Sequence, residues 1–433
     1  MFIEKLVSYV ASKKYDEYLH FDADASYVLP LKKSAHSSLM LYMHVPFCET
    51  LCTYCSFHRV IFQEDLARAH FAALRKEAVM YKERGYDFNS VYVGGGTPTV
   101  LMDELANTLD FIKKLFDIKE ISVETNPNHL SMDKMKILKE TGVNRLSVGV
   151  QSFDDEILRL IGRYHKYGSG QQMVEKIAAL EGFFDTLNVD MIFNFPSQTE
   201  SKLQYDLNAL RELKVDQITF YPLMVSSVTR KLMTKKLGRI SDVREKTFYK
   251  TITEILQEDY VASTAWCFSR VNSEESESPM VDEYVINHDE YVGLGSGAIS
   301  YLNGSIFVNS FDIKEYINQI EQGKFFIEGR RDFSLKEKLL YDFLMQFFGL
   351  SLDLNQLSQK HGVNASKRLW LEILLFTMVG AVKREGDRLT LTSRGQYYWV
   401  VMMREFFTSV DNFRDYCRAK ANLTLDIKEG LYL

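Results

Sequence analysis

Short apolar segments alternate with amphipathic segments along the first half of the chain. From residue 39 the pattern predicts six strands that are mostly apolar or β-branched, and most of them are followed by a segment with apolar residues at helical spacing. Strands of this kind are typical of a parallel sheet that helices cover on both faces. The sequence therefore predicts an α/β fold whose natural architecture is a partial or closed barrel of six β/α units. The predicted strands are residues 39–45, 90–93, 120–124, 145–150, 187–193 and 217–223, and the helices are 63–84, 103–116, 132–140, 169–184, 200–213 and 242–259.

A different pattern begins near residue 334. Three helices (336–348, 354–361 and 367–378) precede a hairpin over 381–392, and a last helix covers 394–407. This order resembles a winged helix, but the unit is not notably basic, so a packing or substrate-cap role is favoured over DNA reading. We expect four regions: an N-terminal helical extension (1–38), the barrel core (39–260), a strand and loop extension that completes the catalytic domain (261–330), and the C-terminal winged-helix-like domain (331–433).

Composition narrows the class of protein. The 433 residues are 46% hydrophobic and 25% charged, and the net charge is 52 − 58 = −6, which does not favour non-specific binding of nucleic acid. The first residues lack the long apolar core of a signal peptide or membrane span. Five cysteines, three of them clustered, indicate a reducing compartment, so a cytoplasmic protein is expected. An acidic stretch at 273–278 is expected to be a loop, either a tether or a substrate-covering lid.

The clustered cysteines are Cys48, Cys52 and Cys55. A cubane iron–sulfur cluster takes four soft ligands, usually thiolates, so three close thiolates indicate a cluster with one iron open to another ligand. Two other interpretations stay open: a structural zinc site that lacks its fourth ligand, and three unrelated buried thiols.

Polar residues recur where the predicted strands end. Gly94–Thr97, Glu124, Asn126 and Gln151 close three of the strands, and Asp190 lies within the next. Because parallel strands end at one edge of a sheet, this convergence favours a single active site. Asp190 is costly in an apolar strand unless it is paired. Alternatives are a surface carboxylate for Glu124, a helix-surface ion pair for Arg163, and ordinary core positions for Trp266, Phe268, Cys267 and Cys417.

The CxxxCxxC spacing, with Tyr54 before the last cysteine, resembles the cluster loop of radical S-adenosylmethionine (SAM) enzymes. The resemblance implies a [4Fe–4S] cluster whose open iron is chelated by SAM. An electron from the cluster would then cleave SAM to a 5′-deoxyadenosyl radical, which is chemistry that the cofactor rather than the protein supplies.

Further segments resemble the oxygen-independent coproporphyrinogen III oxidase (HemN)-like family, in order from about residue 39 to 300. That family also includes the heme chaperone HemW and the class C radical SAM methyltransferases. The matching segments are Tyr42-x-His44-x-Pro46-Phe47-Cys48 and residues 94–99, 124–127, 142–153, 162–165, 188–192 with 196–199, and 293–298.

When the functional residues of the family are placed on the matching positions of this sequence, the resemblance implies that the three cysteines hold the cluster. It also implies that Tyr42 and Glu124 are candidates for catalytic roles. A position near Leu223 would touch SAM, and one near Ala298 would touch an additional SAM found in some members, so one or two SAM molecules are expected. The implied SAM-binding residues are Tyr42, Tyr54, Gly95, Gly96, Thr97, Glu124, Gln151, Arg163, Asp190, Leu223 and Ala298.

The reaction that the resemblance favours is oxidative decarboxylation of the propionates of coproporphyrinogen III in porphyrin biosynthesis. The expected partners are a tetrapyrrole substrate, whose propionates an arginine such as Arg270 would grip, and an electron donor such as flavodoxin or ferredoxin. Two departures from the patterns of individual family members leave alternatives to this reaction open. Phe57 stands where the decarboxylase has a fourth cysteine, and the asparagine- and tryptophan-containing segment of the heme chaperone is not found. Residues 266–270 faintly resemble the heme-opening methyltransferases, so a methyltransferase and a heme chaperone are the alternatives.

Overall fold

The computed structural model describes residues 39–271, 288 and 290–421, eight positions before residue 22 (4, 7–9, 12–13, 15 and 21), and the backbone of two short strands, β18 (Leu425–Asp426) and β19 (Leu431–Tyr432). The helical extension predicted over residues 1–38 lies mostly outside the described residues. The acidic stretch 273–278 lies wholly outside them, so neither prediction is tested here.

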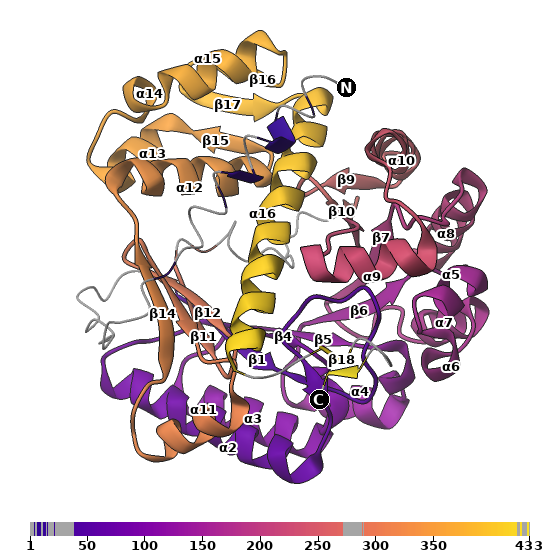
Figure 1. Cartoon of the computed structure of the whole chain (residues 1–433), viewed down its shortest axis with the longest axis vertical. Coiled ribbons are helices and arrows are strands. Elements are labelled where there is room, and N and C mark those ends of the chain that lie inside the picture. The colour runs from indigo at the N-terminus through magenta and orange to yellow at the C-terminus, as the bar shows by residue number, and fades with distance from the viewer. Residues whose placement is uncertain are drawn as a thin grey trace.

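A run of parallel strands forms the centre of a 12-stranded sheet (Figure 1). In spatial order the run is β11-β1-β4-β5-β6-β7-β8, and each neighbouring pair is parallel. Six of these strands are the ones predicted from the sequence, and their side chains are buried almost throughout, as a sheet covered on both faces requires. The mixed α/β class with a mostly parallel sheet is thus confirmed. The strands are β1 (Met40–Val45), β4 (Ser90–Gly95), β5 (Glu120–Thr125), β6 (Arg145–Gln151), β7 (Thr186–Phe193), β8 (Gln217–Pro222) and β11 (Tyr291–Leu294).

Antiparallel strands extend this sheet at both edges. Beside β8 lie β10 (Cys267–Arg270) and β9 (Tyr260–Ala262). Beside β11 lie β12 (Ile299–Leu302), β13 (Ser305–Asn309) and β14 (Ile327–Asp332), and α11 (Ile313–Glu321) connects the last two. Residues 261–330 therefore supply strands to two distant edges of one sheet.

Helices connect the parallel strands and bury their apolar sides against the sheet (Figure 1). In α2, for example, Phe71, Leu74 and Ala78 recur at helical spacing and are buried. The predicted helix 169–184 is shorter, because the chain leaves the helix at Ala178 and turns through Gly182, whose φ is +66°. The helices are α2 (Glu64–Glu83), α3 (Met102–Leu115), α4 (Met132–Glu140), α5 (Asp155–Leu160), α6 (Tyr164–Tyr167), α7 (Gly170–Ala178), α8 (Glu200–Leu213), α9 (Ser227–Leu237) and α10 (Asp242–Leu256).

The C-terminal elements differ from the predicted order in two places. A short strand, β15 (Ser351–Asp353), pairs with the hairpin, and the helix predicted over 367–378 is divided at Leu369 into two helices. The sheet order is β15-β17-β16, and the hairpin turns at Gly386, whose φ is +65°. The other elements are α12 (Leu335–Phe348), α13 (Leu354–His361), α14 (Ala365–Arg368), α15 (Trp370–Met378), β16 (Val382–Glu385) and β17 (Arg388–Leu391).

The last helix, α16 (Ser393–Lys420), is much longer than predicted. The sequence between 407 and 420 holds no glycine or proline, and Asp411–Arg414 and Asp415–Arg418 pair at the i, i+3 spacing that supports a helix. Figure 1 shows α16 running from the C-terminal elements across the sheet. Among the described helices, none is both long and apolar enough to cross a membrane.

Candidate functional site

A cavity of about 360 Å³ lies where the parallel strands end. It is large enough for a small-molecule cofactor. Eleven of the fourteen site residues named from the sequence line it: Tyr42, Cys48, Cys52, Tyr54, Cys55, Gly95, Gly96, Glu124, Gln151, Arg163 and Asp190. The expectation that these residues meet at one edge of the sheet agrees with this placement.

The cysteine loop leaves β1 and is closed at its base. Two short parallel strands, β2 (Phe47–Cys48) and β3 (Val60–Ile61), pair there, and the Val60 amide donates to Pro46 O at 2.7 Å. The amide of Phe62 donates to Cys48 O at 2.8 Å. The ends of the loop are therefore held together, and all three thiols face the same cavity.

Two buried arginines bind main-chain carbonyl oxygens of the cysteine loop. Arg59 Nη2 donates to the carbonyl oxygens of Cys52 and Cys55, at 2.7 and 2.5 Å. Arg418, near the end of α16, donates from Nη1 to Ser56 O and Phe57 O, at 2.9 and 2.7 Å. Both side chains are almost fully buried. Bonds from a charged donor to main-chain carbonyls are stronger than neutral ones, so the loop is fixed without using its sulfurs.

The thiols themselves suit a multi-iron group. Burial raises the pKa of Cys48 to about 12, although the nearby Arg59 acts in the opposite direction. A metal that coordinates such a thiol deprotonates it. Across the described ranges, no three His, Cys, Asp or Glu side chains are close enough to share one metal ion. In a cluster each thiolate binds a different iron, and the three cysteines, which line one cavity, are the residues that could hold such a group.

The glycine segment after β4 allows the backbone to pass close to the loop and to Glu124. A Cβ on Gly96 would lie 2.8 Å from Phe47 O and 3.0 Å from Cys48 Sγ, and one on Gly94 would lie 2.7 Å from Glu124 Oε1. Glu124 accepts bonds from Gly95 N at 3.1 Å and from Tyr92 OH at 2.9 Å. Its carboxylate is therefore held at the cavity wall, which excludes the alternative of a free surface group.

Arg163 joins three parts of the site and is 3% exposed, so it does not form a helix-surface ion pair. Its Nη1 lies 3.4 Å from both Cys52 Sγ and Tyr54 OH, and its Nη2 donates to Asn126 Oδ1 at 3.0 Å. Nε is buried without a hydrogen-bond partner in the described structure. A cation in this position can neutralise negative charge on the cluster loop or on a bound carboxylate.

Asp190 and Gln151 occupy neighbouring strands. Asp190 accepts bonds from Ser147 Oγ at 2.8 Å and from Asn188 Nδ2 at 2.7 Å, so this carboxylate has the partners that a position within a buried strand requires. The register of β6 against β7 shifts between Gly149 and Gln151, and Gln151 has a φ of +78°. This bulge turns the last residue of β6 into the cavity.

A chain of polar groups leads from the cavity into the core. Tyr42 OH bonds His44 Nδ1 at 2.9 Å, and His44 Nε2 bonds the carbonyl of His58 at 2.9 Å. Because a carbonyl only accepts, Nε2 carries the proton of His44 and Tyr42 donates to Nδ1. Burial lowers the pKa of His44 to about 4, so its ring is neutral, and burial raises the pKa of Tyr42. Tyr42 is therefore a fixed, protonated hydroxyl at the cavity wall.

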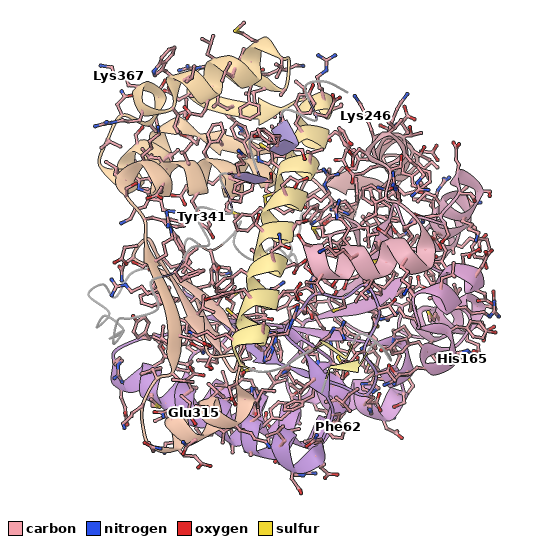
Figure 2. All side chains as sticks on the ribbon, in the orientation of Figure 1. Phe62, His165, Lys246, Glu315, Tyr341 and Lys367 are labelled. Carbon is pink, nitrogen blue, oxygen red and sulfur yellow. The ribbon has the colours of Figure 1, made fainter. Side chains whose placement is uncertain are left out.

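The opposite wall of the cavity was not anticipated from the sequence. It is mostly apolar and comes from the edge strands, α12 and α16, and Figure 2 shows Tyr341 between the C-terminal helices and the sheet. The α16 residues Asp411 and Arg414 add charge, and Arg414 Nη1 donates to Asp411 Oδ1 at 2.8 Å. Both lie beyond the predicted end of this helix. The apolar residues are Tyr291, Ile299, Ile306, Tyr341, Met345, Phe348, Met403, Phe406, Phe407 and Val410.

Three named residues do not line the cavity. Thr97 is buried behind it, where its hydroxyl lies 3.6 Å from Cys48 Sγ and accepts from Asn126 Nδ2 at 2.8 Å. Leu223 and Ala298 are buried in the core, although residues on both sides of each line the cavity.

Five other residues named in the sequence analysis lie outside the cavity. Arg270 does not line the cavity. Its Nη1 donates to Lys214 O and its amide to Asp216 O, near the amino end of β8. Trp266, Phe268, Cys267 and Cys417 are buried core residues, as the alternatives predicted.

The comparison with protein families finds the radical SAM superfamily over residues 42–235. The heme chaperone HemW of Bacillus subtilis (strain 168) is 32% identical over 308 residues, which cover 69% of this chain and 80% of that protein. The oxygen-independent coproporphyrinogen III oxidase of Salmonella typhimurium is 25% identical over 407 residues, which cover 86% of each chain.

Among solved structures, the coproporphyrinogen III oxidase (HemN) from Escherichia coli, described as a radical SAM enzyme, matches with a TM-score of 0.74. The match covers 89% of this chain and 95% of that chain at 20% sequence identity. This likeness shows a shared fold.

Proposed function

This chain belongs to the radical SAM superfamily and, within it, to the family of HemN and HemW, and from that premise we propose that it uses a [4Fe–4S] cluster and SAM to act on a tetrapyrrole. The observation that carries the proposal is that one cavity joins the three-thiol loop and the polar strand ends to an apolar, aromatic wall. A flat macrocycle with acidic side chains needs an apolar surface and a cation together, and this cavity has both.

Each wall has its own task in this proposal. Cys48, Cys52 and Cys55 hold the cluster, and the residues at the strand ends bind and orient SAM. When bound there, the cluster and SAM would supply radical chemistry for hydrogen-atom abstraction. Arg163 balances charge beside the loop, and Tyr42, which keeps its proton, holds a hydrogen bond rather than acting as a base. In the same proposal, residues 39–260 form a partial barrel of six β/α units and residues 331–433 a winged-helix-like cap.

The substrate side favours a propionate-bearing porphyrin precursor. Arg414 lies on the cavity wall next to aromatic residues of the same helix, and an arginine can bind a carboxylate bidentately. The reaction that we propose is oxidative decarboxylation of a propionate. The hydrogen atom leaves the β-carbon, CO₂ leaves the side chain, and one electron passes to an external acceptor, which gives a vinyl group.

A heme chaperone is the second candidate, and a specific observation favours it. Two HemW proteins, from Bacillus subtilis (strain 168) and Lactococcus lactis, are 32% and 30% identical to this chain. Phe57 also stands where the decarboxylase resemblance calls for a fourth cysteine. The same apolar wall would then hold heme without turnover.

The test is an anaerobic assay of the reconstituted protein with SAM, reduced flavodoxin and coproporphyrinogen III. We expect 5′-deoxyadenosine and a vinyl-bearing product, and both should be lost in Cys55→Ala. Cys267→Ala is the matched control, because this cysteine is buried outside the cavity. S-adenosylhomocysteine with a methylated product would instead indicate a methyltransferase. Stable heme binding without 5′-deoxyadenosine would indicate a chaperone, and a protein that takes up zinc but no cluster would overturn the whole proposal.

A further inference from the structure

Helix α15 exposes an apolar face at the outer end of the C-terminal elements. The face consists of Trp370, Leu371, Leu374, Leu375 and Met378, which are 60%, 46%, 45%, 52% and 74% exposed. These positions follow the spacing i, i+1, i+4, i+5 and i+8, so they form one continuous stripe on the helix. We call this stripe the α15 face.

Among the residues that the structure describes, packing explains only the other side of this helix. Ile373 is buried and Phe376 is partly buried, on the side that faces the C-terminal core. A helix that is apolar all round is normally buried on all sides, and a contiguous exposed apolar patch marks an interaction site more often than chance. None of the five residues of the α15 face lines the cavity, so the face does not belong to the proposed active site.

Positive charge surrounds this face. Residues 354–394 carry seven Lys and Arg against three Asp and Glu, a net charge of 7 − 3 = +4, whereas the whole chain carries −6, which leaves −6 − 4 = −10 for the rest. Arg394 donates to the Val379 carbonyl at the end of α15, and Arg384 donates to Ser366 in the preceding helix α14. Basic groups therefore lie at both ends of the face. The exposed basic residues are Lys367, Arg368, Lys383, Arg384, Arg388 and Arg394.

We propose that the α15 face docks on the surface of an anionic phospholipid bilayer. Apolar and tryptophan side chains bordered by Lys and Arg are the combination that binds peripherally to such a surface. A second copy of the chain fits less well, because a symmetric contact would bring two regions of charge +4 together. Figure 2 shows Lys367 at the outer edge of the molecule, beside the C-terminal helices, where a flat surface can approach.

Tryptophan fluorescence can test this contact at the residue itself. The chain has three tryptophans, and Trp266 and Trp399 are fully buried, so Trp370 is the one that a bilayer can reach. The protein is mixed with vesicles that contain phosphatidylglycerol or with vesicles of pure phosphatidylcholine, and emission and co-sedimentation are measured. We expect a blue shift and co-sedimentation with the first lipid mixture and neither with the second. Trp370→Phe should remove the shift but keep the co-sedimentation.

Two variants separate the apolar and charged contributions. Leu374→Ser with Met378→Ser should abolish co-sedimentation, whereas Val261→Ser, which changes an exposed apolar residue on β9, should leave it unchanged. Lys367→Gln with Arg368→Gln should weaken binding roughly 30-fold, because each basic residue near such a surface contributes about five-fold. All variants should cleave SAM normally, so failure here is distinct from failure of the proposed function. Equal binding to both lipids, no binding to either, or a dimer that Leu374→Ser dissociates would overturn the proposal.

Discussion

Replacing Arg418 by glutamine should loosen the cluster loop from a distance of more than 350 residues along the chain. Arg418 Nη1 donates to Ser56 O at 2.9 Å and to Phe57 O at 2.7 Å, and the side chain also pairs with Asp415. These carbonyls directly follow the last cysteine of the loop. Glutamine is shorter and uncharged, so it cannot make the same two bonds.

The size of the effect follows from the burial of this arginine. A hydrogen bond from a charged donor contributes about 1.5–3 kcal/mol, and at 2% exposure solvent screens Arg418 little. Because both bonds share one nitrogen, we expect a loss of about 3 kcal/mol in total rather than the full sum. If the loop opens before iron is lost, about 3 kcal/mol raises the open population roughly 150-fold.

The assay measures how fast a ferrous chelator removes iron from the anaerobically reconstituted protein. Arg418→Gln should release iron roughly 150-fold faster than the wild type. Its melting temperature should fall by only a few degrees, since a chain of this length has a large unfolding entropy. Lys420→Gln is the matched control, because Lys420 lies on the same helix but is exposed. Iron release from Arg418→Gln at the wild-type rate would show that α16 does not support the loop.

Three further predictions concern one residue of the cavity wall and two buried charged residues outside it. Gly96→Ala should prevent cluster assembly, because the new Cβ would lie within 3 Å of main-chain atoms of Phe47 that cannot move away. The measurement is the iron content after reconstitution, and a full iron complement would contradict the prediction. Arg404→Met should lower the melting temperature, measured by calorimetry, by about 4 °C. The substitution leaves Glu245, which is fully buried and bonded to Arg404 at 2.6 Å, without its cation, at a cost of about 3–5 kcal/mol. An unchanged melting temperature would mean that the pair is energetically neutral. Burial raises the pKa of Asp206 to about 7, so its contribution to stability is present at low pH and is lost as the pH rises through 7. In denaturant unfolding, the free energy of unfolding of Asp206→Asn should therefore rise relative to that of the wild type by about 1.4 kcal/mol per pH unit between pH 5 and 7. A difference in unfolding free energy that does not change with pH would refute this assignment.

The sequence was informative wherever a local pattern determines the structure. Alternation of apolar strands and amphipathic helices predicts the parallel strands. Because such strands end at one edge of the sheet, the same pattern predicts that Glu124, Gln151 and Asp190 lie together. The residues that it missed depend on contacts between distant segments. Arg59 looked like any basic residue after a cysteine loop, and only the fold places its guanidinium under the carbonyls of Cys52 and Cys55.

Among the features that the sequence does not predict, the C-terminal end of α16 contributes most to the site. The predicted helix ends at residue 407, although the segment beyond it has no helix breaker, so the sequence pattern does not indicate Arg414 and Arg418 as site residues. Periodicity indicates that a helix continues but not what it reaches, so the role of its last three turns became visible only in the packed chain.

α16 makes the cavity and the cysteine loop mutually dependent. Near its middle, Arg404 is bonded to the buried Glu245 of α10, and further along, Asn412 accepts from the amide of Ser227 at the start of α9. Its last turn binds the loop carbonyls through Arg418, while the residues between these contacts form the apolar wall. A displacement of α16 that widens the cavity must therefore also pull on the loop that holds the thiols. The apolar wall and the cysteine loop are thus connected through one helix, so a change in one should alter the other.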